Sequence, residues 1–378
     1  MSQPPKKKIA LVMRDWSSSI GGAERFSVNL AKGLVAGGMD VQIWGGAVDR
    51  DLGLDDRFHK ITYRKKPSSV KVWSFCRGYQ KLLQAFNIDV TFGITQVYPV
   101  DVYRVGSGIY PNWLRIQNPN LLLRWIHLLT RPVYWANRMI EKRIMTNPRL
   151  KKVVVNSKLE KKNLLRFYPV AEEKIEVIYN GVDLDRFHPM RNEDSAVVRA
   201  ELDTKTDDSV VLFASNNFRR KGLAVLMRAV ALLKEGSVVV WVAGRGKEKA
   251  FRSLAKQLDM AHRVRFLGEH SDMPRLYGAS DCMVLPTQYD SFSNVVLEAM
   301  ACDIPVITTP NNGAAEAIEP GVNGYIMKHH NDVEGLARLI QEVLRNKPAW
   351  QGRPRKRAEA FSPEDSLAKY VDLFQNLG

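Results

Sequence analysis

The stretch SVVLFASNNFRRKGLAVLM, from Ser209 to Met227, joins an apolar run to a helical pattern through a polar loop. The run SVVLFAS has the apolar, partly β-branched composition of a buried strand, and the apolar residues after Gly222 recur at helical spacing. A buried strand followed by a helix is half of a βαβ unit, from which parallel sheets are built. The stretch therefore predicts a parallel α/β fold in this part of the chain.

The same alternation continues through the rest of the sequence. In the first half, strands are predicted at residues 8–14, 40–45, 60–65, 88–94, 102–106, 152–157 and 174–181. In the second half, they are predicted at residues 209–215, 238–244, 263–268, 282–287 and 305–309, with helices at 221–234 and 332–344. Residues 181–198 are rich in charge and poor in strand signal, and they are predicted as a linker. The pattern predicts an α/β protein of two doubly wound, Rossmann-like domains facing a cleft, with ligands at the carboxyl ends of the strands.

Length and composition limit the possible classes of function. A chain of 378 residues is long for one core, and its net charge of +16 indicates an anionic partner: nucleic acid, an acidic membrane surface or a phosphorylated ligand. Cys76, Cys282 and Cys302 stand alone, so no disulfide framework or zinc site is indicated, and a reducing, cytoplasmic setting fits best. The run IALVM near the N-terminus is too short for a signal peptide, and no run has the length of a transmembrane helix. We therefore expect a soluble or peripheral protein.

Two loops have the composition of phosphate-binding loops. Gly21 and Gly22 come just before a predicted helix, where glycines allow a close approach and free helical amides favour an anion. A tight strand-to-helix turn is an equally good interpretation of the glycine pair. Arg219, Arg220 and Lys221 follow a predicted strand at its ligand-binding end, where cations could neutralise a diphosphate. The alternative for these three residues is a solvated basic loop.

The stretch QYDSFSNVVLEAM, residues 288–300, places two acids eight positions apart. We expect a helix that begins around Ser293, with Asp290 before it and Glu298 among its apolar residues. The amides of Phe292, Ser293 and Asn294 would then point at an anion, while the two acids accept hydrogen bonds from ligand hydroxyls. The alternative is a capping aspartate together with a glutamate paired to some base.

Residues 111–152 combine many basic residues with tryptophan and tyrosine and contain one acid, Glu141. Aromatic residues beside a basic stripe are typical of helices that lie on an anionic bilayer, and Pro132 is expected to begin a new helix. The alternative is a core-packed helix with a solvated basic edge. The residues predicted to contact a membrane are Trp113, Arg115, Arg124, Trp125, Arg131, Trp135 and Arg138.

Taken together and in this order, these segments resemble a known enzyme family. The matching segments are the Gly21-Gly22 loop, VVVNSKLEKKNLLRFY, IEVIYNGVDLDRFHP, RRKG, RVRFLG, YDSFSNVVLEA, PVITT, and NNGAAEAI followed by GVNGYIM. The chain resembles the retaining glycosyltransferases of family GT4, which have the GT-B fold, over nearly its whole length. The segments GGAERF and DVYRVGSGIY look most like those of the lipopolysaccharide core glucosyltransferases, which add glucose to a heptose.

The resemblance implies two domains, residues 1–183 for the acceptor and 184–363 for the nucleotide sugar, with a C-terminal helix at 364–378 that packs back on the first. In the family's EX7E motif, the second glutamate binds the ribose and the first binds the donor sugar. Glu298 matches the second, whereas Asp290 stands in place of the first and is one methylene shorter. Lys221 matches the diphosphate-binding lysine, with Arg219 or Arg220 as its partner. Residues 106–108, GSG, offer no match to the histidine or aspartate that many relatives carry near the donor sugar.

The implied reaction is transfer of a hexose, with retained configuration, from a UDP-sugar such as UDP-glucose to a membrane-associated glycolipid, without metal, cofactor or an enzyme nucleophile. The predicted catalytic residues are Lys221, Arg220 and Asp290. The predicted donor-binding residues are Gly21, Gly22, Arg219, Ser291, Phe292, Ser293, Asn294, Val295 and Glu298. The expected place is the inner face of the cell membrane, and nucleic acid is not an expected partner because no nucleic-acid motif is present. The alternatives are a nucleotide-sugar 2-epimerase of the same fold, or a basic membrane- or nucleic-acid-binding protein without transfer activity.

Overall fold

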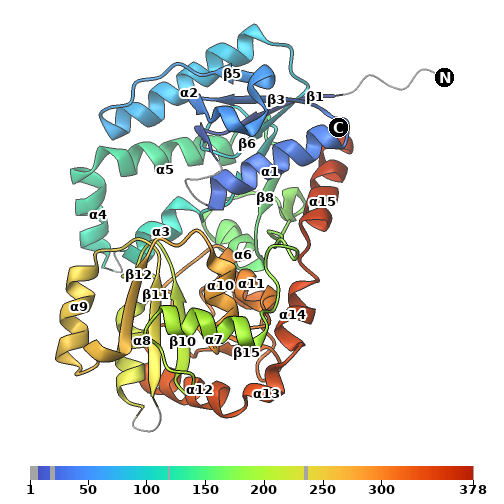
Figure 1. The fold of residues 1–378 in the computed structure, drawn as a ribbon. Coiled ribbons are helices and arrows are strands. Elements are labelled where there is room, and N and C mark those ends of the chain that lie inside the picture. Colours follow the sequence, from blue (N-terminus) through green and yellow to red (C-terminus); the bar gives the residue numbers. More distant parts are fainter. Residues whose placement is uncertain (1–6, 18–21, 118–119, 234–236, 378) are drawn as a thin grey trace. The chain divides into compact units, whose positions relative to one another are not determined.

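The computed structural model describes residues 7–17, 22–117, 120–233 and 237–377. The chain divides into two compact units (Figure 1). The first, here called the N-unit, comprises Met1–Tyr179 with Glu364–Gly378, and the second, the C-unit, comprises Asn180–Pro363. Each unit is built on its own parallel sheet, so each is described by itself.

The sheet of the N-unit has seven parallel strands among the described residues, in the order β5-β3-β1-β6-β7-β8-β9. These are β1 (Lys8–Val12), β3 (Asp40–Gly45), β5 (Phe58–Lys60), β6 (Val90–Gly93), β7 (Val102–Val105), β8 (Lys152–Val155) and β9 (Ile175–Val177). A second small sheet pairs β2 (Asp15–Trp16) with β4 (Ala47–Val48). The strand predicted at 60–65 is wrong: β5 ends at Lys60, because its partner β3 ends at Gly45, whose carbonyl takes the last bond from Ile61.

Helices cover both faces of this sheet. They are α1 (Gly22–Ala36), α2 (Ser68–Ala85), α3 (Tyr110–Gln117), α4 (Leu121–Thr130), α5 (Pro132–Met145), α6 (Lys158–Phe167) and α15 (Pro363–Gln375). One core cluster joins the sheet to α2, α5 and α6, and the other joins it to α1 and α15. Tyr370 and Phe374 of α15 lie against Phe92 of β6 with ring centroids 5.7 and 5.4 Å apart, and α15 runs beside α1 (Figure 1). The last helix of the chain is therefore part of the N-unit core.

The sheet of the C-unit has six parallel strands in the described part of residues 180–363, in the order β12-β11-β10-β13-β14-β15. They are β10 (Ser209–Ala214), β11 (Val238–Ala243), β12 (Val264–Gly268), β13 (Cys282–Leu285), β14 (Val306–Thr308) and β15 (Gly324–Ile326). Successive strands are added outward on either side of β10 and β13, which is the order of a Rossmann sheet. The two parallel sheets confirm the predicted fold class of two Rossmann-like units.

The helices of the C-unit are α7 (Asn192–Glu201), α8 (Leu223–Ala231), α9 (Glu248–Gln257), α10 (Met273–Gly278), α11 (Asn294–Ala301), α12 (Val333–Arg345), α13 (Lys347–Trp350) and α14 (Arg353–Ala358). Short 3₁₀ turns lie at Arg50–Leu52, Asp55–Arg57, Glu172–Lys174, Ala261–Arg263 and Gly313–Ala317. The helices predicted at 221–234 and 332–344 are confirmed by α8 and α12. The segment 181–198, predicted as a linker, ends in the first turns of α7, and the C-unit begins at Asn180.

Candidate functional site

The loop from β10 to α8 places Lys221 at the carboxyl end of β10. Gly222 follows in the left-handed region, with φ of 85°, and caps α8. A β-carbon at Gly222 would lie 2.1 Å from the carbonyl oxygen of Pro286, which follows β13. Only glycine combines this conformation with this approach. Gly222 therefore lets the loop that carries Lys221 lie directly against the loop that leads to α11.

Lys221 is buried, with 8% of the residue exposed, and its ammonium group has two partners on that second loop. Lys221 Nζ forms an ion pair with Asp290 Oδ2 and donates a hydrogen bond of 2.9 Å to Ser293 Oγ. Ser293 Oγ in turn donates to Asp290 Oδ2 at 2.6 Å. Burial lowers the pKa of Lys221 well below its usual range, and the nearby Arg220 adds to that effect, whereas the adjacent carboxylate favours the charged form. The ammonium, hydroxyl and carboxylate groups form one hydrogen-bonded cluster.

The backbone of Asp290 is fixed by the segment after β14. Its amide donates to the carbonyl of Asn311 at 2.9 Å, and its carbonyl accepts from the amide of Gly313 at 2.9 Å. Its second carboxylate oxygen, Oδ1, accepts a hydrogen bond of 3.2 Å from the amide of Phe292. Asp290 thus precedes the cap of α11, which is Ser293, and α11 begins at Asn294 as expected.

Asn312 contributes a side chain that the sequence analysis did not predict. This residue is 1% exposed, and its Oδ1 accepts from the amides of Ser293 and Ala314, both at 3.2 Å. Its amide nitrogen donates to Thr308 Oγ1 at 3.0 Å. The expectation that the amides of Phe292 and Ser293 point at a ligand therefore differs from the structure, where both donate to side chains of the site itself. The sequence carries an Asn-Gly pair at residues 312–313, which is typical of a turn but does not by itself predict this side-chain role.

Helix α11 presents a half-exposed face and a buried face. Asn294, Val295 and Glu298 are half-exposed, whereas Val296, Leu297, Ala299 and Met300 are buried. The i, i+4 spacing of Asn294 and Glu298 puts both on one side, so Glu298 escapes the core despite its apolar neighbours. This explains how an acid is accommodated in an apolar run, and it places Val295, a predicted donor-binding residue, on the half-exposed face.

Two polar side chains contact that half-exposed face. Tyr277 of α10 donates from its hydroxyl to Glu298 Oε2 at 2.9 Å, and Asn180 donates to Asn294 Oδ1 at 2.7 Å. Burial raises the pKa of Tyr277 well above its usual value, and the carboxylate of Glu298 raises it further. The phenol therefore remains a hydrogen-bond donor to Glu298 at neutral pH. Neither Tyr277 nor Asn180 was among the predicted site residues.

The remaining predicted donor and catalytic residues lie in different environments. Arg220 donates from its guanidinium to the carbonyl of Tyr289 at 3.1 Å, and burial lowers its pKa, whereas Arg219 is exposed. Ser291 is buried next to Asp290. In the N-unit, Gly22 is the exposed first residue of α1, and Gly21 lies outside the described residues. Of the predicted set, the structure brings Lys221, Asp290 and Ser293 into direct contact.

The predicted membrane segment forms α3, α4 and α5. Arg115, Arg131, Trp135 and Arg138 are exposed, and Trp135 has half of its surface in solvent (52%). Arg124 is half-buried, and the side chain of Trp125 lies outside what the structure describes. Trp113 differs, because it stacks on Tyr110 at 5.6 Å and is half-buried within an aromatic cluster.

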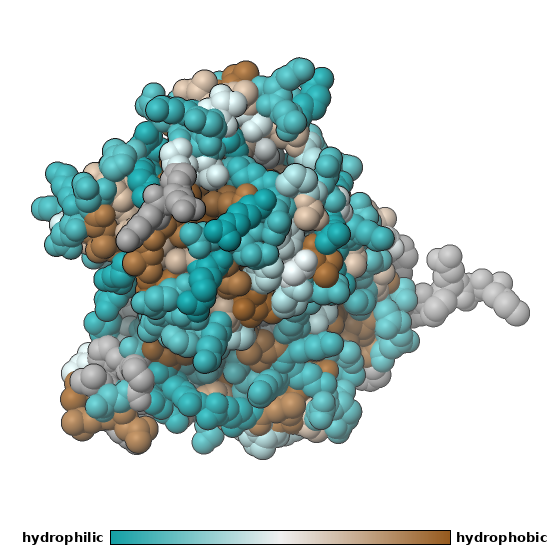
Figure 2. Space-filling model, turned by 90° about the horizontal axis from the view of Figure 1, so that it is seen from below, coloured by the Kyte–Doolittle hydropathy of each residue, from teal (hydrophilic) through white to brown (hydrophobic). Residues whose placement is uncertain are grey.

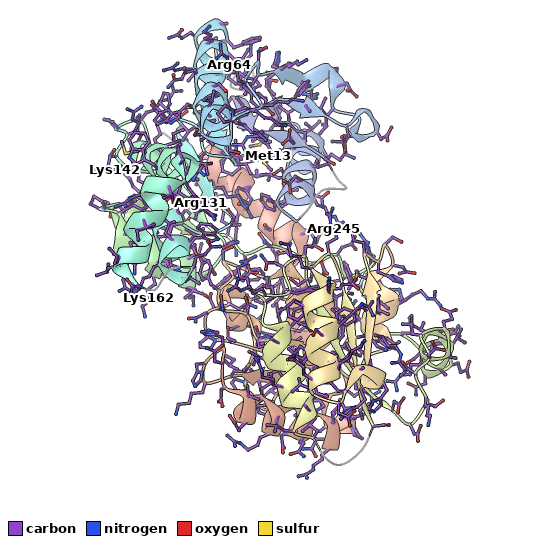
Figure 3. All side chains as sticks on the ribbon, turned by 90° about the vertical axis from the view of Figure 1, so that its left-hand side faces the viewer. Met13, Arg64, Arg131, Lys142, Lys162 and Arg245 are labelled. Carbon is purple, nitrogen blue, oxygen red and sulfur yellow. The ribbon has the colours of Figure 1, made fainter. Side chains whose placement is uncertain are left out.

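Basic and apolar groups meet on this segment. Arg131 and Lys142 lie at the two ends of α5 (Figure 3), and the guanidinium of Arg131 donates to the hydroxyl of Tyr134 at 2.9 Å. Leu121, Leu122 and Ile126 of α4 are exposed large apolar residues. The face drawn in Figure 2 is mostly hydrophilic, with hydrophobic residues in separate patches. No helix among the described residues has the length and apolar character needed to cross a bilayer.

Comparison with known proteins extends the sequence resemblance. Residues 194–361 match the family described as Glycosyl transferases group 1, and residues 20–186 match Glycosyltransferase Family 4. The D-inositol 3-phosphate glycosyltransferase of Mycobacterium sp. (strain JLS) is 33% identical over 208 residues, which are 53% of this chain and 46% of that protein. The chain thus aligns with about half the length of these mycobacterial relatives.

Two solved structures share the fold over almost the whole chain. WaaG, a glycosyltransferase involved in lipopolysaccharide biosynthesis, is 20% identical with a TM-score of 0.82, covering 97% of this chain and 100% of WaaG. Anabaena HepE, solved in complex with UDP and glucose, is 20% identical with a TM-score of 0.75, covering 98% of this chain and 100% of HepE. The two family matches take in most of the chain from residue 20 to residue 361, and the fold agrees with them: the chain belongs to the GT-B glycosyltransferases of the group 1 and Family 4 type.

Proposed function

We propose that this protein transfers a hexose from a nucleoside diphosphate sugar to a glycolipid acceptor at a membrane surface, with retention of configuration and without a metal ion. The observation that carries the proposal is the buried Lys221 ammonium at the carboxyl end of β10, next to the start of α11. Parallel α/β sheets bind their ligands at this edge. A buried cation there is suited to a diphosphate, and its pairing with Asp290 shows that it is within reach of an anionic group.

The difficult step is the departure of the nucleoside diphosphate, which develops negative charge as the glycosidic bond breaks. Lys221 would stabilise that charge, and Arg220 would add a second cation after leaving the carbonyl of Tyr289. Glu298 is half-exposed on α11, and its Oε2 accepts a hydrogen bond from the hydroxyl of Tyr277; a carboxylate in this position suits the hydroxyls of a ribose. Asp290 would lie near the sugar, because it precedes the helix.

UDP-glucose is the proposed donor. Its support comes from the HepE structures, which hold UDP, glucose and UDP-glucose in the same fold, and from the WaaG fold match. The proposed acceptor is a lipid-linked glycan such as the heptose of a lipopolysaccharide core. Its support is the exposed apolar and basic surface of α4 and α5, which suits an anionic bilayer on the inner face of the cell membrane.

The donor is tested by incubating purified protein with UDP-, GDP- and ADP-sugars and following thermal unfolding and release of nucleotide. We expect UDP-glucose to stabilise the protein and to be hydrolysed slowly, in the presence of EDTA as in its absence. Lys221→Ala should slow hydrolysis about 10²–10³-fold. Isomerised donor without any sugar transfer would instead identify an epimerase, and failure of every nucleotide sugar to bind would refute the proposal.

Membrane contact is tested by sedimentation with vesicles that contain anionic lipid. Arg131→Glu with Arg138→Glu should reduce binding by about tenfold or more, since each basic residue near an anionic surface contributes about 1 kcal/mol. Lys249→Glu with Lys256→Glu changes two exposed lysines of α9 in the C-unit by the same total charge and serves as the matched control. Equal loss of binding in the control would indicate a general charge effect and would count against a docking surface on α4 and α5.

A further inference from the structure

The carboxylate of Asp290 binds the same protein groups that a phosphate would be expected to bind. One oxygen, Oδ2, pairs with the ammonium of Lys221 and accepts a hydrogen bond from the hydroxyl of Ser293. The other, Oδ1, accepts a hydrogen bond from the amide of Phe292. A cation, a hydroxyl and a backbone amide at a helix start are the usual partners of a bound phosphate. In this structure, all three are satisfied from within the protein.

The geometry limits how Asp290 can coexist with a ligand. Lys221 is almost fully buried, and the side chain of Asp290 is 16% exposed, so solvent screens the pair poorly. The backbone of Asp290 cannot shift freely, because it pairs with Asn311 and Gly313 on both of its sides. A diphosphate on Lys221 would bring two anions into one poorly solvated site, which is unfavourable. Rotation of the Asp290 side chain is the movement that the fixed backbone leaves open.

We propose that Asp290 is an internal counter-ion of Lys221, which the donor diphosphate must displace and which returns to Lys221 when the nucleotide leaves. This inference rests on the proposed function and adds to it a positioning residue that competes with both donor and product. In the empty site, Asp290 keeps a buried cation neutralised. In the occupied site, the diphosphate takes over Lys221 and the hydroxyl of Ser293. Asp290 thereby weakens binding of the nucleoside diphosphate product and favours its release.

The inference predicts an unusual pair of effects for one substitution. Asp290→Asn keeps the size and the hydrogen-bonding oxygen but removes the competing charge. UDP should therefore bind about tenfold more tightly or better, the lower end of what one charge contributes at ~4 Å in a partly buried site. Turnover should fall, because product release slows and the carboxylate is lost from the site. A residue that merely supported the fold, or bound the sugar alone, would not strengthen UDP binding when neutralised.

The experiment is isothermal titration of UDP into the wild type, Asp290→Asn, Asp290→Glu, Lys221→Ala and the double variant Lys221→Ala/Asp290→Asn. Asp290→Glu retains the charge and should not bind UDP more tightly. In the Lys221→Ala background, Asp290→Asn should lose most of its effect, because the pair is coupled through the ammonium group. Unchanged or weaker UDP binding by Asp290→Asn would overturn the inference while leaving the proposed function intact. If UDP bound none of these proteins, the proposed function and the inference would both fail.

Asp290→Asn leaves a buried ammonium without its carboxylate and could unfold the C-unit, so a second measurement uses the wild type. A crystal structure with UDP should show Lys221 Nζ on a phosphate oxygen and the Asp290 carboxylate turned away from it. If the Lys221–Asp290 ion pair remained intact with the diphosphate bound in the site, the inference would be wrong.

Discussion

Gly222→Ala is expected to destabilise the C-unit and weaken donor binding together, because this glycine holds the Lys221 loop against the loop after β13. Two costs add at this position. The left-handed conformation costs a non-glycine residue about 1–2 kcal/mol, and a β-carbon 2.1 Å from the carbonyl oxygen of Pro286 must push the backbone away, which costs about 1–3 kcal/mol. The expected loss in the free energy of unfolding is therefore about 2–5 kcal/mol.

Gly268→Ala is the matched control for this substitution. Gly268 belongs to the same unit and has a similar φ of 67°, yet a β-carbon there would meet nothing within 4 Å. It should lose only the conformational part, about 1–2 kcal/mol. Urea denaturation followed by tryptophan fluorescence and circular dichroism measures both variants.

If Gly222→Ala and Gly268→Ala lost the same stability, the close approach to Pro286 would carry no cost. If Gly222→Ala lost the expected stability but bound UDP as the wild type does at a temperature where it is folded, the glycine would not position Lys221.

Lys221→Ala should lower kcat with UDP-glucose about 10²–10³-fold, as removal of one group that stabilises a developing anion does, and steady-state kinetics would show an unaltered kcat if the lysine were only structural. Tyr277→Phe removes the hydroxyl bound to Glu298 and should raise KM for the donor about fivefold, equivalent to ~1 kcal/mol, with little change in kcat. Burial raises the pKa of Glu141 to about 7, so the folded N-unit holds a proton there that the unfolded chain releases near pH 4.5. Its stability should fall between about pH 4.5 and 7 by up to ~3 kcal/mol, and Glu141→Gln should flatten that part of the pH profile; an identical slope in the variant would contradict the assignment.

Most strands of both sheets could be predicted from the sequence because buried parallel strands are short, nearly continuous apolar runs. The eleven residues from Ser209 to Arg219 by themselves predict a strand and the start of the loop that carries Lys221. β15 was missed, because its first residue is the glycine of an Asn-Gly turn signal and only two apolar residues of the strand come after it. Strands of this length are formed by pairing with a neighbour, in this instance β14, and not by local preference.

The start of α11 and the position of Glu298 on its half-exposed face could also be predicted from the sequence, since capping and helical spacing are local. The partner of the Ser293 amide could not. The amide of Ser293 is taken by Asn312, nineteen positions further along, and the hydroxyl of Tyr277 reaches Glu298 from another helix. Such contacts depend on which loops the sheet order brings together. The sequence alone therefore does not show whether an amide at the start of a helix is available to a ligand. The contact between Lys221 and Asp290 belongs to the same class.

The side-chain length at position 290 determines whether the carboxylate can reach the ammonium of Lys221. Hydrogen bonds to Asn311 and Gly313 fix the backbone of Asp290, so the side chain alone decides where the carboxylate lies. One more methylene would extend the side chain by about 1.5 Å, the length of a C–C bond, and a glutamate would have to fold back to keep its carboxylate on Lys221 Nζ and Ser293 Oγ. An aspartate can therefore neutralise the buried ammonium of Lys221 while the site is empty. The ammonium needs such a partner because an unpaired buried charge is costly. The same short side chain leaves more room beyond it for the donor sugar, so Asp290→Glu should alter the relative kcat/KM values for different hexoses on one nucleotide without tightening the binding of the nucleotide itself.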